Sequence, residues 1–431
     1  MSHLIWFQNN LRVHDNTVLA ETYQGQNVLA VYFFDPRNFD IGDFGFKKTE
    51  KYRARFLLES VATLKQNLAS LNISLLVYHD KPEAVLPKLV EEHGVTDIFM
   101  QKEWTRDETV VLKKVKQKIR PTVIFHEIFD QFLVHPADSP FHSFADVPDV
   151  FTDFRKRIEN RASIRAVVPI PKKLPKKNLV ENNTQLPELE TLGLEGFTTD
   201  SRTAFPFKGG EDQALKRVHH YFWETQKLKT YKKTRNGLVG PDFSSKLSPW
   251  LANGSISARY VYWQIKEFEK EIIKNQDTYW LFFELLWRDY FKYISLKYGD
   301  KIFSLGGIFD RKIQWENDSE TLQKWISGHT DEPFVNANMI ELANTGWMSN
   351  RGRQNVASYW SKTLRQDWHI GAAYFESLLL DYDVHSNWGN WLYVSGVGND
   401  GRDRKFNIQR QAEIYDRNGA FQRLWLQPSL F

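Results

Sequence analysis

Residues 28–34, VLAVYFF, are seven consecutive apolar residues in which β-branched and aromatic side chains predominate. Such residues favour β-strands, and a strand that is apolar at every position is buried on both faces, as in parallel sheets. Four similar runs occur within the first 130 residues, at LIWF (4–7), SLLVYH (74–79), DIFMQ (97–101) and TVIFHEI (122–128). These runs predict five buried strands.

Helical patterns lie between the predicted strands. In residues 50–71 apolar side chains recur at helical spacing, at Phe56, Leu57, Val61, Leu64, Leu68 and Leu71. A second helix is expected from Pro82 to just before Gly94, because proline favours a first helical turn and glycine a helix end. The alternation predicts a doubly wound α/β domain over residues 1–130, with its ligand beyond the carboxyl ends of the strands.

The rest of the chain divides into a connector and a second domain. Residues 131–205 contain PIPKKLPKK (169–177) and polar stretches, and we interpret them as a long interdomain connector. Residues 206–431 are predicted to be all-helical because strand-like alternation is scarce there. Helices are expected at about 211–227, 257–270, 276–298, 333–345, 350–364 and 370–380.

The composition excludes several classes of protein and site. Charged residues make up 26% and hydrophobic residues 42% of the chain, which is typical of a globular protein. The absence of cysteine excludes disulfides, thiol nucleophiles and cysteine-ligated metals, and no metal site is expected. No apolar run is long enough to cross a membrane, and MSHLIWFQNN at the N-terminus does not resemble a signal peptide. We therefore expect a cytoplasmic protein, and expect it to be monomeric.

Positive charge is concentrated in two segments, although the net charge is only +4. Residues 155–177 contain nine basic residues and one acid, and residues 216–235 contain seven basic residues. Patches of this kind bind polyanions such as nucleic acids through counterion release, although a solvated surface explains them equally simply. The 15 tryptophans, nearly all after position 220, suit either base and flavin stacking or a large helical core.

Four stretches of the second domain combine polar and aromatic residues. DFSSKLSPW (242–250) predicts a helix capped by Ser248, where the serine hydroxyls and free N–H groups form either an anion site or simply an ordinary helix start. WLFFELLWRDYF (280–291) puts Glu284, Trp287 and Arg288 on one helical face, as a ligand clamp or as a simple Glu–Arg pair. GWMSNRGRQNVASYW (346–360) places polar residues at a helix start, and Arg353 is expected to pair with Asp381 of DYDVHSNWGNWLY (381–393).

The order of these motifs resembles the photolyase/cryptochrome family over both domains. WFQNNLRVHDN (6–16) begins a segment similar to the family's antenna-binding α/β domain. GWMSNRGRQNVAS and GNWLY followed by GVGND are most similar to the DASH cryptochromes. The resemblance implies that the second domain binds FAD in a U-shape and that DYDVHSNWGNWLY forms the floor of the flavin pocket.

The resemblance also assigns cofactor-binding residues. Arg353 and Asp381 would pair over the flavin, Asp383 would bind the flavin N3–H, and Asn387 would face N5. Lys246 stands where many members have arginine. The phosphate and remaining FAD contacts implied are Tyr231, Ser244, Ser245, Leu247, Ser248 and Arg288.

A cavity for a cyclobutane pyrimidine dimer would adjoin the flavin. Glu284 would stabilise the dimer radical anion, and it joins Asn387 as an implied catalytic residue. Gln354 and Tyr393 stand where ordinary dimer photolyases have methionine and tryptophan, and both differences indicate a DASH protein. The remaining implied substrate contacts are Trp287, Asn350 and Arg351.

Two accessory functions follow from the resemblance. Trp391, Trp368 and Trp315 match an electron relay that runs from the flavin to the surface. Glu108, with Asp107, would bind a folate-type antenna, methenyltetrahydrofolate, although a solvated helix start explains these acids as well.

The implied function is blue-light-driven repair of cyclobutane pyrimidine dimers by reduced FAD, preferentially in single-stranded or looped DNA. The alternative is a photoreceptor or DNA-binding regulator with little repair activity. Signalling cryptochromes usually add a long C-terminal tail, and this sequence closes at LWLQPSLF (424–431), which favours repair. A light-independent flavin oxidoreductase is disfavoured because no nicotinamide-binding motif is present.

Overall fold

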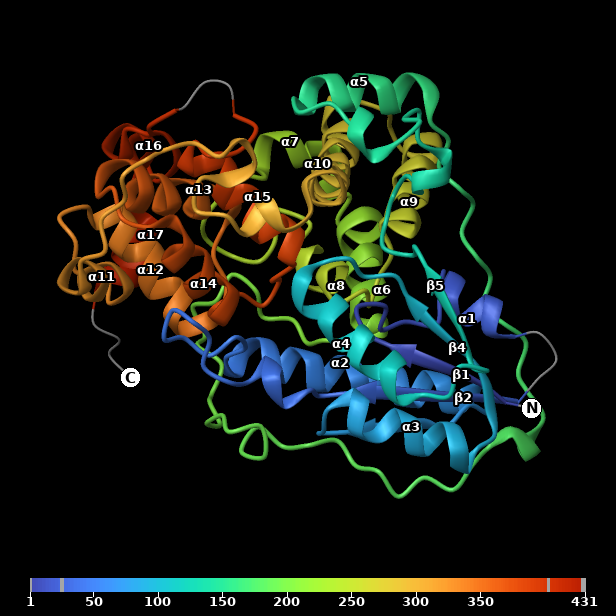
Figure 1. Ribbon diagram of the computed structural model, residues 1–431. Coiled ribbons are helices and arrows are strands. Elements are labelled where there is room, and N and C mark those ends of the chain that lie inside the picture. The colour runs from blue at the N-terminus through green and yellow to red at the C-terminus, as the bar shows by residue number, and fades with distance from the viewer. Residues whose placement is uncertain (1, 24–26, 401–403, 428–431) are drawn as a thin grey trace.

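A computed structural model describes residues 2–23, 27–400 and 404–427 (Figure 1). The five predicted strands are confirmed and form one parallel sheet in the order β3-β2-β1-β4-β5. Their bounds are β1 Ser2–Phe7, β2 Asn27–Phe33, β3 Leu75–Tyr78, β4 Val95–Gln101 and β5 Ile124–Ile128.

Helices cover both faces of this sheet, which explains why the strands are apolar at every position. Ala30 of β2 belongs to the same buried cluster as Val61 of α2, whereas Val31 belongs to the opposite cluster with Leu86 of α3. Each residue of the strand therefore faces one of two apolar layers. The helices of this domain are α1 Thr17–Thr22, α2 Lys51–Ser70, α3 Pro82–Glu92 and α4 Arg106–Lys118.

The second domain is helical, as predicted. Two of the predicted helices are shorter than expected, because 211–227 and 350–364 both end in π-helical turns, at His220–Glu224 and Tyr359–Thr363. No helix of the described ranges is long and apolar enough to span a bilayer. The helices are α6 Glu211–His219, α7 Tyr231–Thr234, α8 Ser248–Ala252, α9 Ala258–Glu271, α10 Gln276–Tyr298, α11 Ser319–Ile326, α12 Pro333–Thr345, α13 Asn350–Ser358, α14 Trp368–Leu378, α15 Val384–Ser395, α16 Ile408–Tyr415 and α17 Ala420–Leu426.

The segment interpreted as a connector contains a packed helix. Helix α5, Phe151–Arg161, buries Phe154 and Ile158 in the core of the helical domain, beside α10. After α5 the chain runs around the outside of the α/β domain (Figure 1). There the Asn178 side chain accepts a hydrogen bond from the backbone N–H of Val28 at 2.8 Å, which attaches the segment to the sheet.

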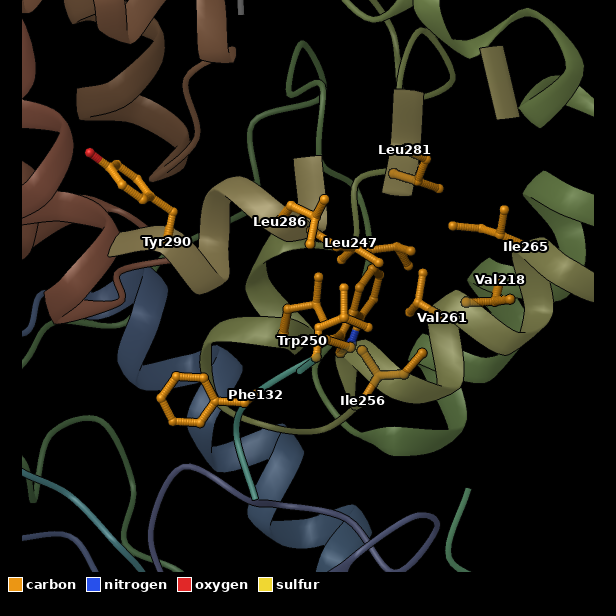
Figure 2. Close-up of a cluster of buried hydrophobic side chains, with 14 of the residues drawn as sticks. Phe132, Val218, Leu247, Trp250, Ile256, Val261, Ile265, Leu281, Leu286 and Tyr290 are labelled. Atoms are coloured by element: carbon orange, nitrogen blue, oxygen red, sulfur yellow. The ribbon is translucent and has the colours of Figure 1, made fainter. Parts of the chain in front are cut away.

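A buried cluster supports the segment that leads into α8. Trp250 is fully buried and packs among Leu247, Ile256 and Val261, as Figure 2 shows. Phe132, from the stretch after β5, reaches the same cluster. The cluster therefore anchors the SSKLS segment to the core of the helical domain.

A buried ionic network joins the two domains. Arg259 of α9 pairs with Asp15, in the loop after β1, at 2.9 Å, and with Asp130, after β5, at 3.1 Å. Asp130 also pairs with Arg12. The side chains of these four residues are at most 4% exposed, so neither aspartate has access to solvent as an alternative partner.

Replacing Asp130 by asparagine is expected to lower the free energy of unfolding by about 3–5 kcal/mol, because the two arginines would keep a buried, uncompensated charge. Urea unfolding would measure the loss. Asp138→Asn provides the control, since it breaks an exposed pair with Arg165 (2.6 Å) and should cost at most about 1 kcal/mol. Equal losses in the two variants would contradict the structural importance of the network.

Candidate functional site

Most of the predicted site residues line one cavity of about 590 Å³. A smaller pocket of about 90 Å³ shares part of this lining and adds Asn387 and Trp391. The predicted residues on the larger cavity are Tyr231, Ser244, Ser245, Leu247, Ser248, Glu284, Trp287, Arg288, Asn350, Arg351, Arg353, Gln354, Asp381, Asp383 and Tyr393.

The serine segment reaches the cavity, but the predicted helix cap is wrong. Helix α8 begins at Ser248, and Leu247, which already has helical backbone angles, is its N-cap without a side-chain hydrogen bond. Ser248 is therefore the first residue of a helix only five residues long, and its exposed hydroxyl does not cap it. Its neighbours Ser244 and Ser245 contribute hydroxyls to the same wall.

Lys246 provides a buried cation on the cavity wall. It is 2% exposed, and its Nζ has no hydrogen-bond partner among the described residues. The ammonium lies 3.3 Å from the Phe243 ring centre and 4.5 Å from that of Trp347. Burial lowers the pKa of Lys246, while burial raises the pKa of nearby Glu341 to about 8. An unpaired buried cation beside a cavity suits an anionic ligand such as a phosphate.

The predicted ion pair between Arg353 and Asp381 is present, with oxygen–nitrogen distances of 2.9 and 3.0 Å. Arg353 Nε also donates to the Met348 carbonyl at 2.9 Å, which holds the guanidinium in place. The pair connects α13 to the turn before α15. It lines both cavities, where it can cover one side of a flat ligand.

Asp383 caps α15 and carries a negative charge into the site. Its side chain accepts a hydrogen bond from the Ser386 N–H at 2.7 Å and pairs with Lys292 at 2.9 Å. Burial opposes ionisation, but Lys292 outweighs it and holds the pKa of Asp383 well below its usual range. Asp383 is therefore an obligatory acceptor, able to receive an N–H from a ligand ring. The sequence analysis missed Lys292, which lies eight residues, about two helical turns, beyond Glu284 on α10.

Asn387 lies one turn into α15 and is 8% exposed. Its Nδ2 donates to the Ala372 carbonyl of α14 at 3.0 Å, which orients the amide at the wall of the smaller pocket. An amide is neutral at every physiological pH, so this position adds no charge to a ligand bound there.

Glu284 pairs with Arg235, so the Glu284–Arg288 pair considered as an alternative does not form. The Glu284–Arg235 distance is 2.8 Å. Burial raises the pKa of Glu284, and the charge of Arg235 opposes that shift. Arg235 belongs to the basic segment 216–235, but its spacing gave no indication that it would meet Glu284. Arg288 is directed elsewhere and donates to two backbone carbonyls, those of Gln131 and Leu251, at 2.6 and 3.1 Å.

An aromatic platform lies beside Glu284. The Trp287 ring stacks on Phe151 of α5, with the ring centres 3.6 Å apart and the planes 13° apart. Tyr393 of α15 approaches Trp287 edge-on at 5.8 Å. With Phe151 covering one of its faces, Trp287 has only the other face to offer a flat ligand in the cavity.

The polar residues of α13 form the opposite wall. Ser349 caps this helix by accepting from the Gly352 N–H at 3.0 Å, and Asn350 is its first residue. Arg351 donates to the Gln354 amide oxygen at 2.9 Å. Since that oxygen is occupied, Gln354 offers its NH₂ group to an acceptor in the cavity.

The three predicted relay tryptophans follow a gradient of burial. Trp391 and Trp368 are buried, whereas Trp315 is only partly buried. The Trp391 ring lies against Gly371, one turn beyond Trp368 in α14; a β-carbon there would fall 2.3 Å from the ring. The backbone of Glu316 pairs with the segment directly before Trp368 at 2.9 Å, which brings Trp315 beside it. The electron relay through these three tryptophans stays a prediction, with Trp315 the residue nearest to solvent.

Another cavity, of about 270 Å³, lies beyond the carboxyl ends of the strands, where the sequence predicted a ligand site, and it shares Arg288 and Asp383 with the main cavity. Asp107 and Glu108 line it. Asp107 is exposed and pairs with Lys48, while burial raises the pKa of Glu108. The sequence analysis missed Glu103, two residues beyond β4, whose pKa is raised to about 7 by burial. Its position after a strand end was the signal that could have identified it.

Both domains match known family models. Residues 280–430 match the FAD binding domain of DNA photolyase, and residues 3–176 match the DNA photolyase model. The cavity fits the matched cofactor domain, because it combines hydroxyls, an unpaired buried cation and an obligatory acceptor.

Similar proteins extend over nearly the whole chain. Cryptochrome DASH of Gloeobacter violaceus is 49% identical, with 98% of this chain and 85% of the relative covered, and that of Xenopus laevis is 47% identical, with 97% and 81% covered. The crystal structure of a Synechocystis cryptochrome has a TM-score of 0.94 at 43% identity, covering 99% of this chain and 88% of that one. A class III photolyase from Agrobacterium tumefaciens has a TM-score of 0.82 at 25% identity, covering 99% and 86%.

These relatives and the converging site residues agree with the resemblance seen in the sequence. The chain belongs to the photolyase/cryptochrome family and, within it, to the DASH cryptochromes, with an α/β domain followed by a helical FAD-binding domain.

Proposed function

We propose that the protein repairs cyclobutane pyrimidine dimers in blue light, preferentially in single-stranded or looped DNA. The observation that carries the proposal is the joint placement of Glu284, Trp287 and Gln354 on the cavity that also holds the predicted flavin contacts. The cavity thus offers a carboxyl group, an aromatic face and an amide to a flat, uncharged ligand beside the cofactor.

FAD would be held by residues that the structure brings together. The phosphates would lie against Ser244, Ser245 and Lys246, and Asp383 would accept the ring N3–H. When bound and reduced, FAD would supply the light-excited electron that splits the dimer and would take that electron back afterwards. Asn387, being neutral, would add no negative charge next to a reduced, anionic ring.

The chain's own residues would bind and orient the lesion. A pyrimidine would stack on the free face of Trp287, while the Gln354 NH₂ donates to a pyrimidine carbonyl. Because burial raises its pKa, Glu284 is held closer to its protonated form, which can donate a hydrogen bond to a base oxygen as negative charge develops there. Arg235 would keep that carboxyl in place.

The energetic cost of extruding the lesion supports the proposed preference for single strands. A lesion must leave the base stack to enter a cavity, and this extrusion costs least from a strand that is already unpaired. Photolyases as a class extrude the target nucleotide in this way. Helix α5, whose Phe151 stacks on Trp287, also carries positive charge beside the cavity. Its exposed cations are Lys156, Arg157 and Arg161.

The cavity at the strand ends would take the antenna. Glu108 and Glu103 line it, and both carboxyls have raised pKa values, so they are suited to hydrogen-bond a neutral pterin ring of a folate such as methenyltetrahydrofolate. The cavity also reaches Lys292 and Asp383, and Asp383 is itself a predicted flavin contact.

The proposed activity is tested by placing one thymine dimer in a single-stranded oligonucleotide and in the matching duplex, with the FAD fully reduced before blue-light exposure. We expect repair of the single strand and little repair of the duplex, measured by loss of the dimer on chromatography. Equal repair of both would contradict the strand preference. Repair of neither would favour a photoreceptor.

Glu284→Ala is expected to lower the repair yield about ten-fold or more, the effect of losing one hydrogen bond to a developing charge. FAD content, measured by absorbance, should not change. Glu267→Ala on the exposed side of α9 is the matched control and should repair normally. An unchanged yield in Glu284→Ala would remove the proposed role of this carboxyl.

Trp391→Phe is expected to prevent light-driven reduction of oxidised FAD in the presence of an external electron donor, since phenylalanine is far harder to oxidise than tryptophan. Bleaching of the flavin absorbance under blue light is the measurement. Trp360→Phe replaces an equally buried tryptophan outside the relay and serves as the control. Normal bleaching in Trp391→Phe would mean that electrons take another route.

A further inference from the structure

A second binding surface lies outside the cavity, along the first turn of α10. Six residues form this surface, which we call the outer groove: Lys232, Lys274, Asn275, Gln276, Tyr279 and Trp280. It lies between α7 and the start of α10, and none of its residues lines the cavity described above. Of these residues only Trp280 bears on the function proposed so far, because its side chain helps to lower the pKa of Glu284.

The outer groove and the cavity lie on one stripe of the same helix. Trp280, Glu284 and Trp287 are separated by four and three residues, so they project from one side of α10. Seven residues of helix advance about 10 Å. Neighbouring bases in a stacked strand are about 3.4 Å apart. A strand whose lesion lies at Trp287 would therefore pass Trp280 within about three nucleotides.

A row of aromatic rings connects the two places. Trp280 stacks on Phe283 with the ring centres 4.6 Å apart, and Phe283 lines the cavity. Phe283 meets Phe151 edge-on at 5.2 Å, and Phe151 stacks on Trp287. Stacked rings bind successive bases of a single strand without regard to sequence.

Positive charge accompanies the rings. Lys232 Nζ lies 4.3 Å from the Trp280 ring centre and also donates to Gln276 at 2.8 Å. Lys274 is exposed at the opposite end of the groove. Arg235, three residues after Lys232, places a further positive charge at the cavity, where it pairs with Glu284.

We propose that the outer groove binds the single-stranded DNA next to the lesion, with a base stacked on Trp280 and phosphates against Lys232 and Lys274. The proposal rests on the proposed repair function and adds its partner surface. Phe283 covers one face of Trp280, so the incoming base takes the face under Lys232. The lysine, a flexible and strongly hydrated cation, moves from the ring to the adjacent phosphate. Cations and rings together favour a nucleic-acid strand over a protein partner.

The test uses dimer-containing oligonucleotides with zero to five nucleotides on each side, and measures the dissociation constant in darkness by fluorescence anisotropy. Wild type should bind more tightly as one flank grows to about three nucleotides. Trp280→Ala should lose that gain, by about 5-fold or more, while binding the dimer without flanks as wild type does. Trp280→Phe should restore most of the gain because it keeps a ring.

The lysines supply an independent measurement on an exposed residue. Lys274→Gln should lower the slope of log affinity against log salt by about 0.7, the value for one phosphate contact on a single strand. Lys270→Gln, on the exposed end of α9, and Trp263→Ala, an exposed tryptophan of the same helix, are the matched controls and should match wild type.

The outcomes separate this surface from the repair activity. A flank-dependent gain that is identical in Trp280→Ala and wild type, with an unchanged salt slope in Lys274→Gln, overturns the proposal even if repair is normal. A flank-dependent gain that wild type shows and Trp280→Ala loses, in a protein that repairs no dimers, supports the groove as a single-strand site and refutes repair alone. Failure of wild type to bind any oligonucleotide overturns both.

Discussion

The buried ionic network between the domains is the constraint on which both cavities depend. Asp15 and Asp130 lie in loops at the carboxyl edge of the sheet, and Arg259 belongs to the helical domain. Buried charges tolerate little displacement, because a separated partner would remain in an apolar environment. Gly254, whose absent β-carbon would fall 2.0 Å from the Asn9 carbonyl oxygen, lets the two backbones approach at the same place. The helical domain is thereby held over the strand ends, where the antenna-type cavity forms.

Helix α10 contributes side chains to three sites. Trp280 faces the outer groove, Glu284 the main cavity, and Lys292 both the strand-end cavity and the carboxylate of Asp383. Successive turns of α10 therefore present an aromatic ring, a carboxyl group and an ammonium group to different sites. A 23-residue helix packed against α5, α7, α9 and α15 can keep these groups in register, whereas separate loops could not.

Much of the fold could be predicted because the relevant signals are local. Strand burial is encoded in runs such as VLAVYFF, and the start of α12 at Pro333 and its end before Gly346 follow from backbone preferences. Helix α15 was missed because polar residues such as His385 and Asn387 are buried beside its tryptophans, so its sequence shows no simple apolar period. The cap predicted for Ser248 failed because propensity locates a helix start only to within a residue or two.

The sequence by itself determined the elements, the two domain types and which polar residues would gather, since ordered motifs and local periodicity are properties of the chain. The Arg353–Asp381 pair was predicted from the sequence, but the tertiary structure alone decided the other charge partners of the site. Glu284 is charge-paired with Arg235, 49 positions away, and Asp383 with Lys292, 91 positions away. Each pairing depends on how helices cross, and no local spacing encodes a crossing. For the same reason the pKa of Asp383, which burial raises and Lys292, His385 and Arg288 lower, could be known only from the folded chain.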